Sequence, residues 1–384
     1  KKVGKLTPAP VFDVEGRSFP VEVRYRPLTD LPVTSSDDDS FDDFEENLPR
    51  AITAAVAECY ADAVSKGHAD QADILVFAAT EAEIRDLADI LTQYGPKHTQ
   101  ILPLFARQTY AEQQRIFNPS GGRRIIIATN VAETALTVPN IRYVIDLGFA
   151  RISRYAYRSR VQRLPIEAIS QAAANQRKGR CGRIAAGVCI RLYSEADFNS
   201  RPAFTEPEIL RTNLASVILQ MANLSLGDVE NFDFIEPPDG RLINDGRKLL
   251  EELGALTKTK KIANQRHQDE TLPDDSVENL PIQKPSKYNK NRDTVHQNPL
   301  TKIGQMMAKM PIDPRLARML IAGEEFGCLK EMLIIVSALS VQDPRERPQD
   351  KQTQADQKHA LFRQPHSDFL FYISLWQALY GSLF

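Results

Sequence analysis

The sequence is poor in the features that mark secreted, zinc-bound and membrane proteins. It has four cysteines in 384 residues, with no CxxC pair, and its six histidines show no metal-ligand spacing. These counts argue against a disulfide framework and predict no protein-built metal site. No apolar run is long enough to span a bilayer, and the charged start does not resemble a signal peptide. We therefore expect a cytoplasmic protein with reduced thiols, no membrane segment and two or three domains.

A strong net charge is also absent, since the formal net charge is −2. Total charge therefore does not indicate a nucleic-acid partner, but the distribution of charge does. The segment 151–183 carries nine Arg or Lys residues against one acid, whereas the segment 37–46 carries seven acids and no base. The first of these segments predicts a local basic surface.

The sequence contains no GxxxxGK[ST] phosphate loop. The candidate Gly4-Lys5-Leu6-Thr7 has no Ser or Thr directly after its lysine. An Asp-Glu-Ala-His tetrad that could hold magnesium is likewise missing. If this chain takes part in nucleotide chemistry, it carries one side of the site and not the phosphate cradle.

Short apolar runs alternate with segments of helical periodicity in the first half of the chain. This alternation predicts a parallel α/β sheet covered on both faces. The predicted strands are 11–14, 21–25, 73–78, 101–105, 123–128, 143–147 and 187–193, and the predicted helices are 48–63, 84–91, 111–117 and 170–182.

The periodicity becomes helical after Pro202. Apolar residues recur at helical spacing through 209–221, 249–253, 303–310 and 316–339. The stretch 258–299 interrupts this pattern because it is rich in Lys, Asn, Gln and Asp, and we expect it to be a disordered insert. Between the two halves, the segment 151–163 alternates five arginines with apolar and aromatic residues and predicts a basic β-hairpin. Two interpretations of this hairpin stay open, an ordinary surface hairpin and a wedge beside nucleic acid.

The octet QRKGRCGR, 176–183, concentrates four cations, two glycines and an amide. On the predicted helix 170–182, Gln176, Arg180 and Arg183 follow at i, i+4 and i+7 and would share one face. Such a face suits phosphate oxygens, although a solvated basic surface is the plainer alternative.

Together, TNVAETALTVP and QRKGRCGR resemble motifs V and VI of superfamily 2 helicases of the DEAH-box RNA helicase branch. MPIDPRLARML, GCLKEMLIIVSALSVQDPRERP and DFLFYISLW resemble the bacterial HrpA subgroup of that branch. The resemblance implies an α/β RecA-like (P-loop NTPase-type) parallel sheet domain followed by winged-helix and helical ratchet domains. The implied division is a connector from a missing first RecA-like domain (1–30), the second RecA-like domain (31–203) with the hairpin 151–168, the winged-helix domain (204–312) with the insert 258–299, and the start of the ratchet domain (313–384).

The resemblance also implies roles for residues on the nucleotide side. Gln176, Arg180 and Arg183 would reach the nucleotide held by the first motor domain, the two arginines acting as arginine fingers in catalysis. Phe117 matches an aromatic residue that stacks on the base, and Thr137 matches a position near the hydrolytic water. The plainer alternatives are a helix-end core residue for Phe117 and a turn residue for Thr137.

On the RNA side, Thr129 and Asn130 match residues that touch the RNA backbone, and both also suit a helix N-cap. Thr80 stands where eukaryotic relatives have a glycine near RNA, and its hydroxyl could substitute. Ala135 replaces the serine of many relatives, which removes a hydroxyl that could sense the nucleotide. Arg177 matches a weaker position, facing solvent or acids.

The resemblance implies the C-terminal part of a monomeric ATP-dependent RNA helicase that couples ATP hydrolysis to translocation on single-stranded RNA and to unwinding. Its partners would be RNA, ATP and the first RecA-like domain, which would hold most of the ATP and Mg²⁺. This chain alone is expected to be inactive. The alternatives are a non-catalytic RNA- or protein-binding module with a helicase-like fold, and a DNA helicase.

Overall fold

The computed structural model describes residues 10, 12, 19–28, 42–68, 72–117, 122–134, 136–156, 158–257, 300–341, 343–347 and 351–380. The expected strand 11–14, the insert 258–299 and Ala135 lie wholly or mostly outside these residues. The chain divides into two compact units, one of residues 1–212 with 341–384 and one of residues 213–340.

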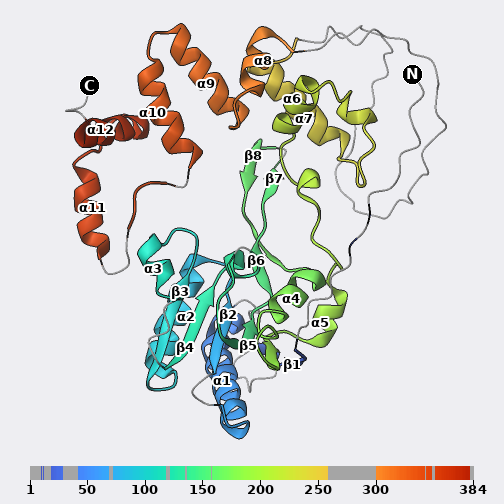
Figure 1. Ribbon diagram of the computed structural model, residues 1–384, viewed down its shortest axis with the longest axis vertical. Helices are drawn as coiled ribbons and strands as arrows, with labels where there is room; N and C mark the ends of the chain where they lie inside the picture. Colours follow the sequence, from blue (N-terminus) through green and yellow to red (C-terminus); the bar gives the residue numbers. More distant parts are fainter. Residues whose placement is uncertain are drawn as a thin grey trace, which may run out of the picture. The chain divides into compact units, whose positions relative to one another are not determined.

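A six-stranded parallel sheet is the centre of the first unit (Figure 1). Its strand order is β1-β10-β5-β2-β4-β3, so the chain crosses over repeatedly, as expected for strands joined by helices. The predicted α/β sheet is confirmed. The strands are β1 (Val21–Tyr25), β2 (Asp73–Phe77), β3 (Thr99–Leu104), β4 (Arg123–Ala128), β5 (Ile141–Asp146) and β10 (Gly187–Arg191).

Each face of this sheet is covered by a different set of side chains. On one face Ile74, Ile125 and Ile145 pack under α1 (Asp42–Ser65) and α2 (Glu81–Tyr94). On the opposite face Leu75, Ile126 and Val144 pack with a second set of apolar residues, which includes Ile116, Ala132, Val138 and Cys181. Successive strand residues point to opposite faces, so runs that are buried on both sides are apolar throughout.

The helix of the basic octet is shorter than its sequence predicts. α4 (Gln171–Lys178) ends at its C-cap Gly179, whose N–H donates to Asn175 O. Arg180 and Arg183 therefore lie in the turn that follows the helix, and the predicted shared face with Gln176 is wrong. Glycine has a low helix propensity, and the turn instead bonds elsewhere, since Phe19 N donates to Gly182 O at 2.9 Å.

The basic segment after β5 forms two successive antiparallel strand pairs (Figure 1). β6 (Phe149–Arg151) pairs with β9 (Ile166–Ala168), and β7 (Arg154–Ala156) pairs with β8 (Val161–Arg163). Within it, Arg154 is an ion-pair residue, bound to Glu167 and Glu206.

The second unit is helical. It contains α6 (Ala215–Asn223), α7 (Gly240–Glu252), α8 (Lys302–Ala308), α9 (Pro314–Glu325) and α10 (Leu329–Ser340). An antiparallel bridge joins Leu256 to Leu300, on either side of 258–299. This unit groups α9 and α10 with the preceding helices, whereas the proposed domain division separates them at residue 313.

Further helices and 3₁₀ turns lie among the described residues. These are α3 (Tyr110–Gln114), α5 (Glu195–Ser200), α11 (Gln352–Ala360), α12 (Asp368–Tyr380) and the 3₁₀ turns η3 (Asn130–Ala132), η4 (Glu208–Leu210) and η5 (Val229–Asn231). In the described part of the chain, no helix combines the length and the apolar character needed to cross a membrane.

Candidate nucleotide and nucleic-acid site

The turn after α4 faces the segment that follows η3. Arg183 Nη1 donates to Thr137 Oγ1 at 2.7 Å, and Arg180 Nη1 lies 3.5 Å from Leu136 O. Three residues predicted to serve the nucleotide, Arg180, Arg183 and Thr137, are thus brought together. Arg183 and Thr137 are exposed, and Arg180 is partly buried.

The two arginines of this turn differ from Arg177 in their carboxylate partners. Among the described residues, neither Arg180 nor Arg183 forms an ion pair. Burial and then the neighbouring charge of Arg183 lower the pKa of Arg180, and Glu133 offsets this only in part. An anion at this turn would relieve the repulsion between the two guanidiniums, so the turn is suited to phosphate oxygens.

Gln176 lies on the last turn of α4 and is exposed. Because the helix ends at Lys178, Gln176 and the two arginines come from different local structures. The neighbouring Arg177 points the other way, into the protein.

Arg177, which the sequence analysis placed against solvent or acids, faces acids. Its side chain is fully buried and pairs with Asp146 at 2.8 Å and with Glu133 at 3.0 Å. It also donates to Phe149 O at 3.1 Å and lies over the ring of Phe77. Burial opposes its charge, but the two carboxylates prevail and raise its pKa. Asp146 at the end of an apolar strand was the signal that could have indicated a buried cation nearby.

The predicted RNA-contacting residues lie at the carboxyl ends of two neighbouring strands. Thr80 follows β2 and Thr129 and Asn130 follow β4, and Ala78 N donates to Ala128 O between them. In a parallel sheet this edge is where ligands bind.

These three side chains differ in their availability. Thr80 is nearly buried and caps α2, accepting a hydrogen bond from Glu83 N at 3.0 Å. Thr129 precedes η3 without a side-chain capping bond, and Asn130 is exposed. Thr129 and Asn130 are therefore the better placed of the three to meet a ligand.

Phe117 ends the turn after α3 and is partly buried. The carbonyl of the preceding residue, Ile116, accepts a hydrogen bond from the buried side chain of Arg124 at 2.7 Å. Phe117 is thus attached to the first residues of β4 through its neighbour.

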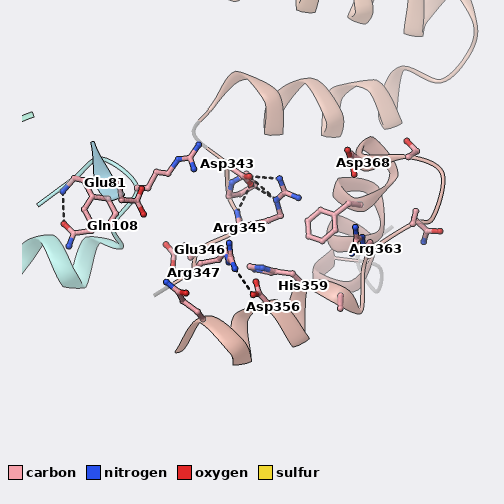
Figure 2. A pocket seen from close by; sticks show the side chains of 18 of the residues that line it. Glu81, Gln108, Asp343, Arg345, Glu346, Arg347, Asp356, His359, Arg363 and Asp368 are labelled. Atoms are coloured by element: carbon pink, nitrogen blue, oxygen red, sulfur yellow. Dashed lines mark hydrogen bonds and ion pairs between the residues drawn. The ribbon is translucent and has the colours of Figure 1, made fainter. Parts of the chain in front are cut away.

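A pocket of about 990 Å³ lies in the first unit, lined by α2, the loop after β3 and residues 343–371 (Figure 2). Its cations include Arg107, Arg345, Arg347 and Arg363, and Arg345 and Arg347 pair with acids of the same segment. The sequence did not predict this pocket, because its two walls are far apart along the chain.

Comparisons with known proteins agree with this geometry. The family model "Helicase conserved C-terminal domain" matches residues 55–185, and "Helicase associated domain (HA2), ratchet-like" matches residues 313–372. The chain is 53% identical over 371 residues to the ATP-dependent RNA helicase HrpA homolog of Haemophilus influenzae and 51% identical to Escherichia coli HrpA, covering 97% of this chain in both cases. Over nearly its whole length, the chain is therefore similar to HrpA-type ATP-dependent RNA helicases.

The solved structure of Escherichia coli DEAH/RHA helicase HrpB superposes with a TM-score of 0.62 at 26% identity, over 96% of this chain and 38% of that one. The chain spans 25% of the length of both HrpA relatives. It therefore corresponds to a segment of these helicases, one that includes the helicase conserved C-terminal domain.

The described residues contain no group of three or more His, Cys, Asp or Glu side chains that could hold a metal ion. A family cofactor such as ATP would meet guanidinium and hydroxyl groups here, and those groups bind phosphate oxygens.

Proposed function

We propose that this chain supplies the arginine-bearing side of the ATP site in a two-domain RNA helicase motor. The first RecA-like domain would hold most of the nucleotide and its Mg²⁺. The observation that carries this proposal is the pair Arg180 and Arg183, set in one turn against Thr137 and without carboxylate partners among the described residues.

In this proposal the two guanidiniums neutralise the charge that develops on the γ-phosphoryl group as it leaves. Arginine fingers contribute about 10³-fold or more to such reactions. Gln176 reaches the nucleotide beside them, the Thr137 hydroxyl lies near the hydrolytic water, and Phe117 stacks on the base. Arg177 stabilises the position of this turn, because its side chain joins α4 to Asp146 at the end of β5 and to Glu133.

RNA would run along the carboxyl edge of β2 and β4, with its backbone against Thr129 and Asn130 and its path bordered by Thr80. Glu133 is the C-cap of η3, three residues after Asn130, and is paired with Arg177, so a shift of the RNA-facing turn would be felt at α4. This connection is how nucleotide hydrolysis would be coupled to movement along single-stranded RNA and to duplex separation.

The buried thiols of Cys59, Cys181 and Cys189 suit a reducing compartment such as the cytoplasm.

Measuring RNA-stimulated ATP hydrolysis tests the proposal. We expect no turnover by the chain alone, and turnover when a first motor domain with a phosphate loop is joined to it. Arg180→Ala with Arg183→Ala should then lower kcat by about 10³-fold, while Arg347→Ala, which removes an exposed ion pair, should leave it unchanged. Turnover by the joined protein that survives the double substitution would refute the role of the arginines.

A binding assay tests the RNA side and distinguishes the alternatives. Arg158→Ala with Arg163→Ala should lower the salt dependence of single-stranded RNA binding by about 0.7 per lost phosphate contact if the hairpin faces RNA. No change would favour an ordinary surface hairpin. Strand separation on matched RNA and DNA duplexes distinguishes an RNA from a DNA helicase, and binding without hydrolysis in the joined protein would indicate a non-catalytic module.

A further inference from the structure

Arg124 is another buried arginine, near the amino end of β4, whereas the RNA-facing turn follows the carboxyl end of that strand. It is the second residue of β4, and its side chain is 2% exposed. It pairs with Asp73, the first residue of β2, through two bonds, Nη2 to Oδ2 at 2.6 Å and Nε to Oδ2 at 3.0 Å. The backbone N–H of Arg124 also donates to Asp73 Oδ1 at 3.1 Å.

The guanidinium reaches beyond its ion pair to two separate segments of the chain. Nη1 donates to Ile116 O at 2.7 Å, and Nη2 donates to Pro139 O at 3.2 Å. Ile116 directly precedes Phe117, and Pro139 lies two residues after Thr137. One side chain thus ties the segment that carries the proposed base-stacking ring to the segment that carries the proposed phosphate-side hydroxyl.

The chemistry of the arrangement requires arginine. A buried ion pair by itself is weak evidence for a role in stability, because desolvation offsets much of the attraction. The planar guanidinium presents five donors in fixed directions, which lets one group serve a carboxylate and two carbonyls at once. A lysine could pair with Asp73, but its single nitrogen cannot replace the two separate nitrogens, Nη1 and Nη2, that donate to Ile116 O and Pro139 O.

We propose that Arg124 is a positioning residue of the nucleotide site, which sets the distance between Phe117 and the Thr137–Arg183 contact. This inference rests on the proposed ATP site. Arg124 itself touches no nucleotide and acts through the backbones of Ile116 and Pro139. Loss of the Arg124 side chain would let the two segments move independently, so the base and the phosphates of the nucleotide could no longer be held at a fixed separation.

The test compares Arg124→Lys with a matched control, Arg201→Lys. Arg201 is also buried, pairs with Asp197 and donates to two carbonyls, Gly148 O and Ile169 O, but it is tied to neither nucleotide-side segment. In the chain joined to a first motor domain, we expect Arg124→Lys to lower kcat/KM for ATP by about tenfold or more. Arg201→Lys should change it by less than about twofold at a similar loss of melting temperature.

A double-mutant cycle with Phe117→Ala separates positioning from stability. If Arg124 acts through Phe117, the rise in KM caused by Arg124→Lys should disappear in the Phe117→Ala background, whereas a purely structural effect would stay additive. Additive effects, or equal losses in both lysine variants, would overturn the inference. If Arg124→Lys does not fold, Asp73→Asn, which leaves Arg124 in place without its orienting charge, enters the same cycle.

The double variant of Arg180 and Arg183 distinguishes a wrong ATP site from a wrong role for Arg124. If that variant and the wild type hydrolyse ATP equally, the proposed site is wrong and the inference falls with it. If only the Arg124 cycle is additive, the site stands and Arg124 is a structural residue alone.

Discussion

At the scale of single residues, three arginines differ in burial and in their carboxylate partners. Arg177 and Arg124 are buried and bound to carboxylates, whereas Arg180 is partly buried without an ion pair among the described residues. Burial costs a charge much of its hydration, so a buried arginine persists only where its partners compensate. The arginine that lacks such partners is the one suited to an incoming anion.

Removing the Arg177 side chain should strongly destabilise the first unit. Arg177→Ala leaves Asp146 and Glu133 without their cation, and Asp146 is completely buried. We expect a loss of about 3–5 kcal/mol in the free energy of unfolding, measured by urea denaturation. Arg347→Ala, which breaks a pair exposed on both sides, should cost no more than about 1 kcal/mol. Equal losses in the two variants would contradict the assigned importance of the buried network.

Glu83 predicts a pH dependence of stability. Burial raises its pKa above the ordinary 4.5, despite the hydrogen bond that it accepts from Ala79 N. Its native pKa exceeds the unfolded one, so its contribution to stability is complete below the unfolded pKa and is lost as the pH rises through the native pKa. The melting temperature of Glu83→Gln should therefore rise relative to wild type as the pH increases from 4.5.

Glu22→Gln is the control of opposite sign. A hydrogen bond from Arg24 lowers the pKa of Glu22, so its contribution is present above the unfolded pKa and lost as the pH falls through the native one. The melting temperature of Glu22→Gln should therefore fall relative to wild type as the pH rises, by a small amount because the carboxylate is 54% exposed. The same slope in both variants would refute the assignment for Glu83.

At the scale of elements, the turn after α4 is shaped by a segment from the start of the chain. A Cβ atom on Gly182 would lie 2.7 Å from Val21 Cγ2 and 2.8 Å from Phe19 O. No side chain fits there without moving β1 or the turn itself. The glycine between Arg180 and Arg183 is therefore required by close approach, since it allows Phe19 N to reach Gly182 O.

Gly182→Ala should lower the stability of this unit by about 1–3 kcal/mol, through overpacking against β1. The thermal melt measures the loss, and Gly240→Ala is the control, because nothing lies within 4 Å of a Cβ at Gly240. At the first position of α7, alanine should be neutral or slightly stabilising. A neutral Gly182→Ala would mean that the turn has room to adjust.

The elements also show which predictions the sequence could support. β1 and β4 have the predicted bounds because their runs are flanked by clear turn signals, and β2 differs by one residue. The end of α4 was missed because the bond between Phe19 and Gly182 joins positions far apart in the sequence. Periodicity in a cation-rich octet could not tell that Arg177 is buried, since its acidic partners, Asp146 and Glu133, belong to other elements.

At the scale of the whole molecule, the sheet has a core of its own. The two apolar clusters that cover its faces draw their buried residues from 51–192. A fragment of residues 1–212 should therefore fold with a cooperative melt followed by circular dichroism. A fragment of residues 1–186 should not, because it lacks β10, which lies between β1 and β5. Cooperative melting of both fragments would show that the sheet tolerates the loss of an interior strand.

The hydrogen bond between Phe19 and Gly182 links the turn after α4 to the chain that leads into β1, so a force on that chain would reach the turn. A pull on the residues before Phe19 would load this hydrogen bond before it loads the ladder between β1 and β10. Tension along the backbone would then act at Gly182, between Arg180 and Arg183. The start of the sheet can in this way serve as a tether, through which a force applied outside the domain changes the separation of the two guanidiniums.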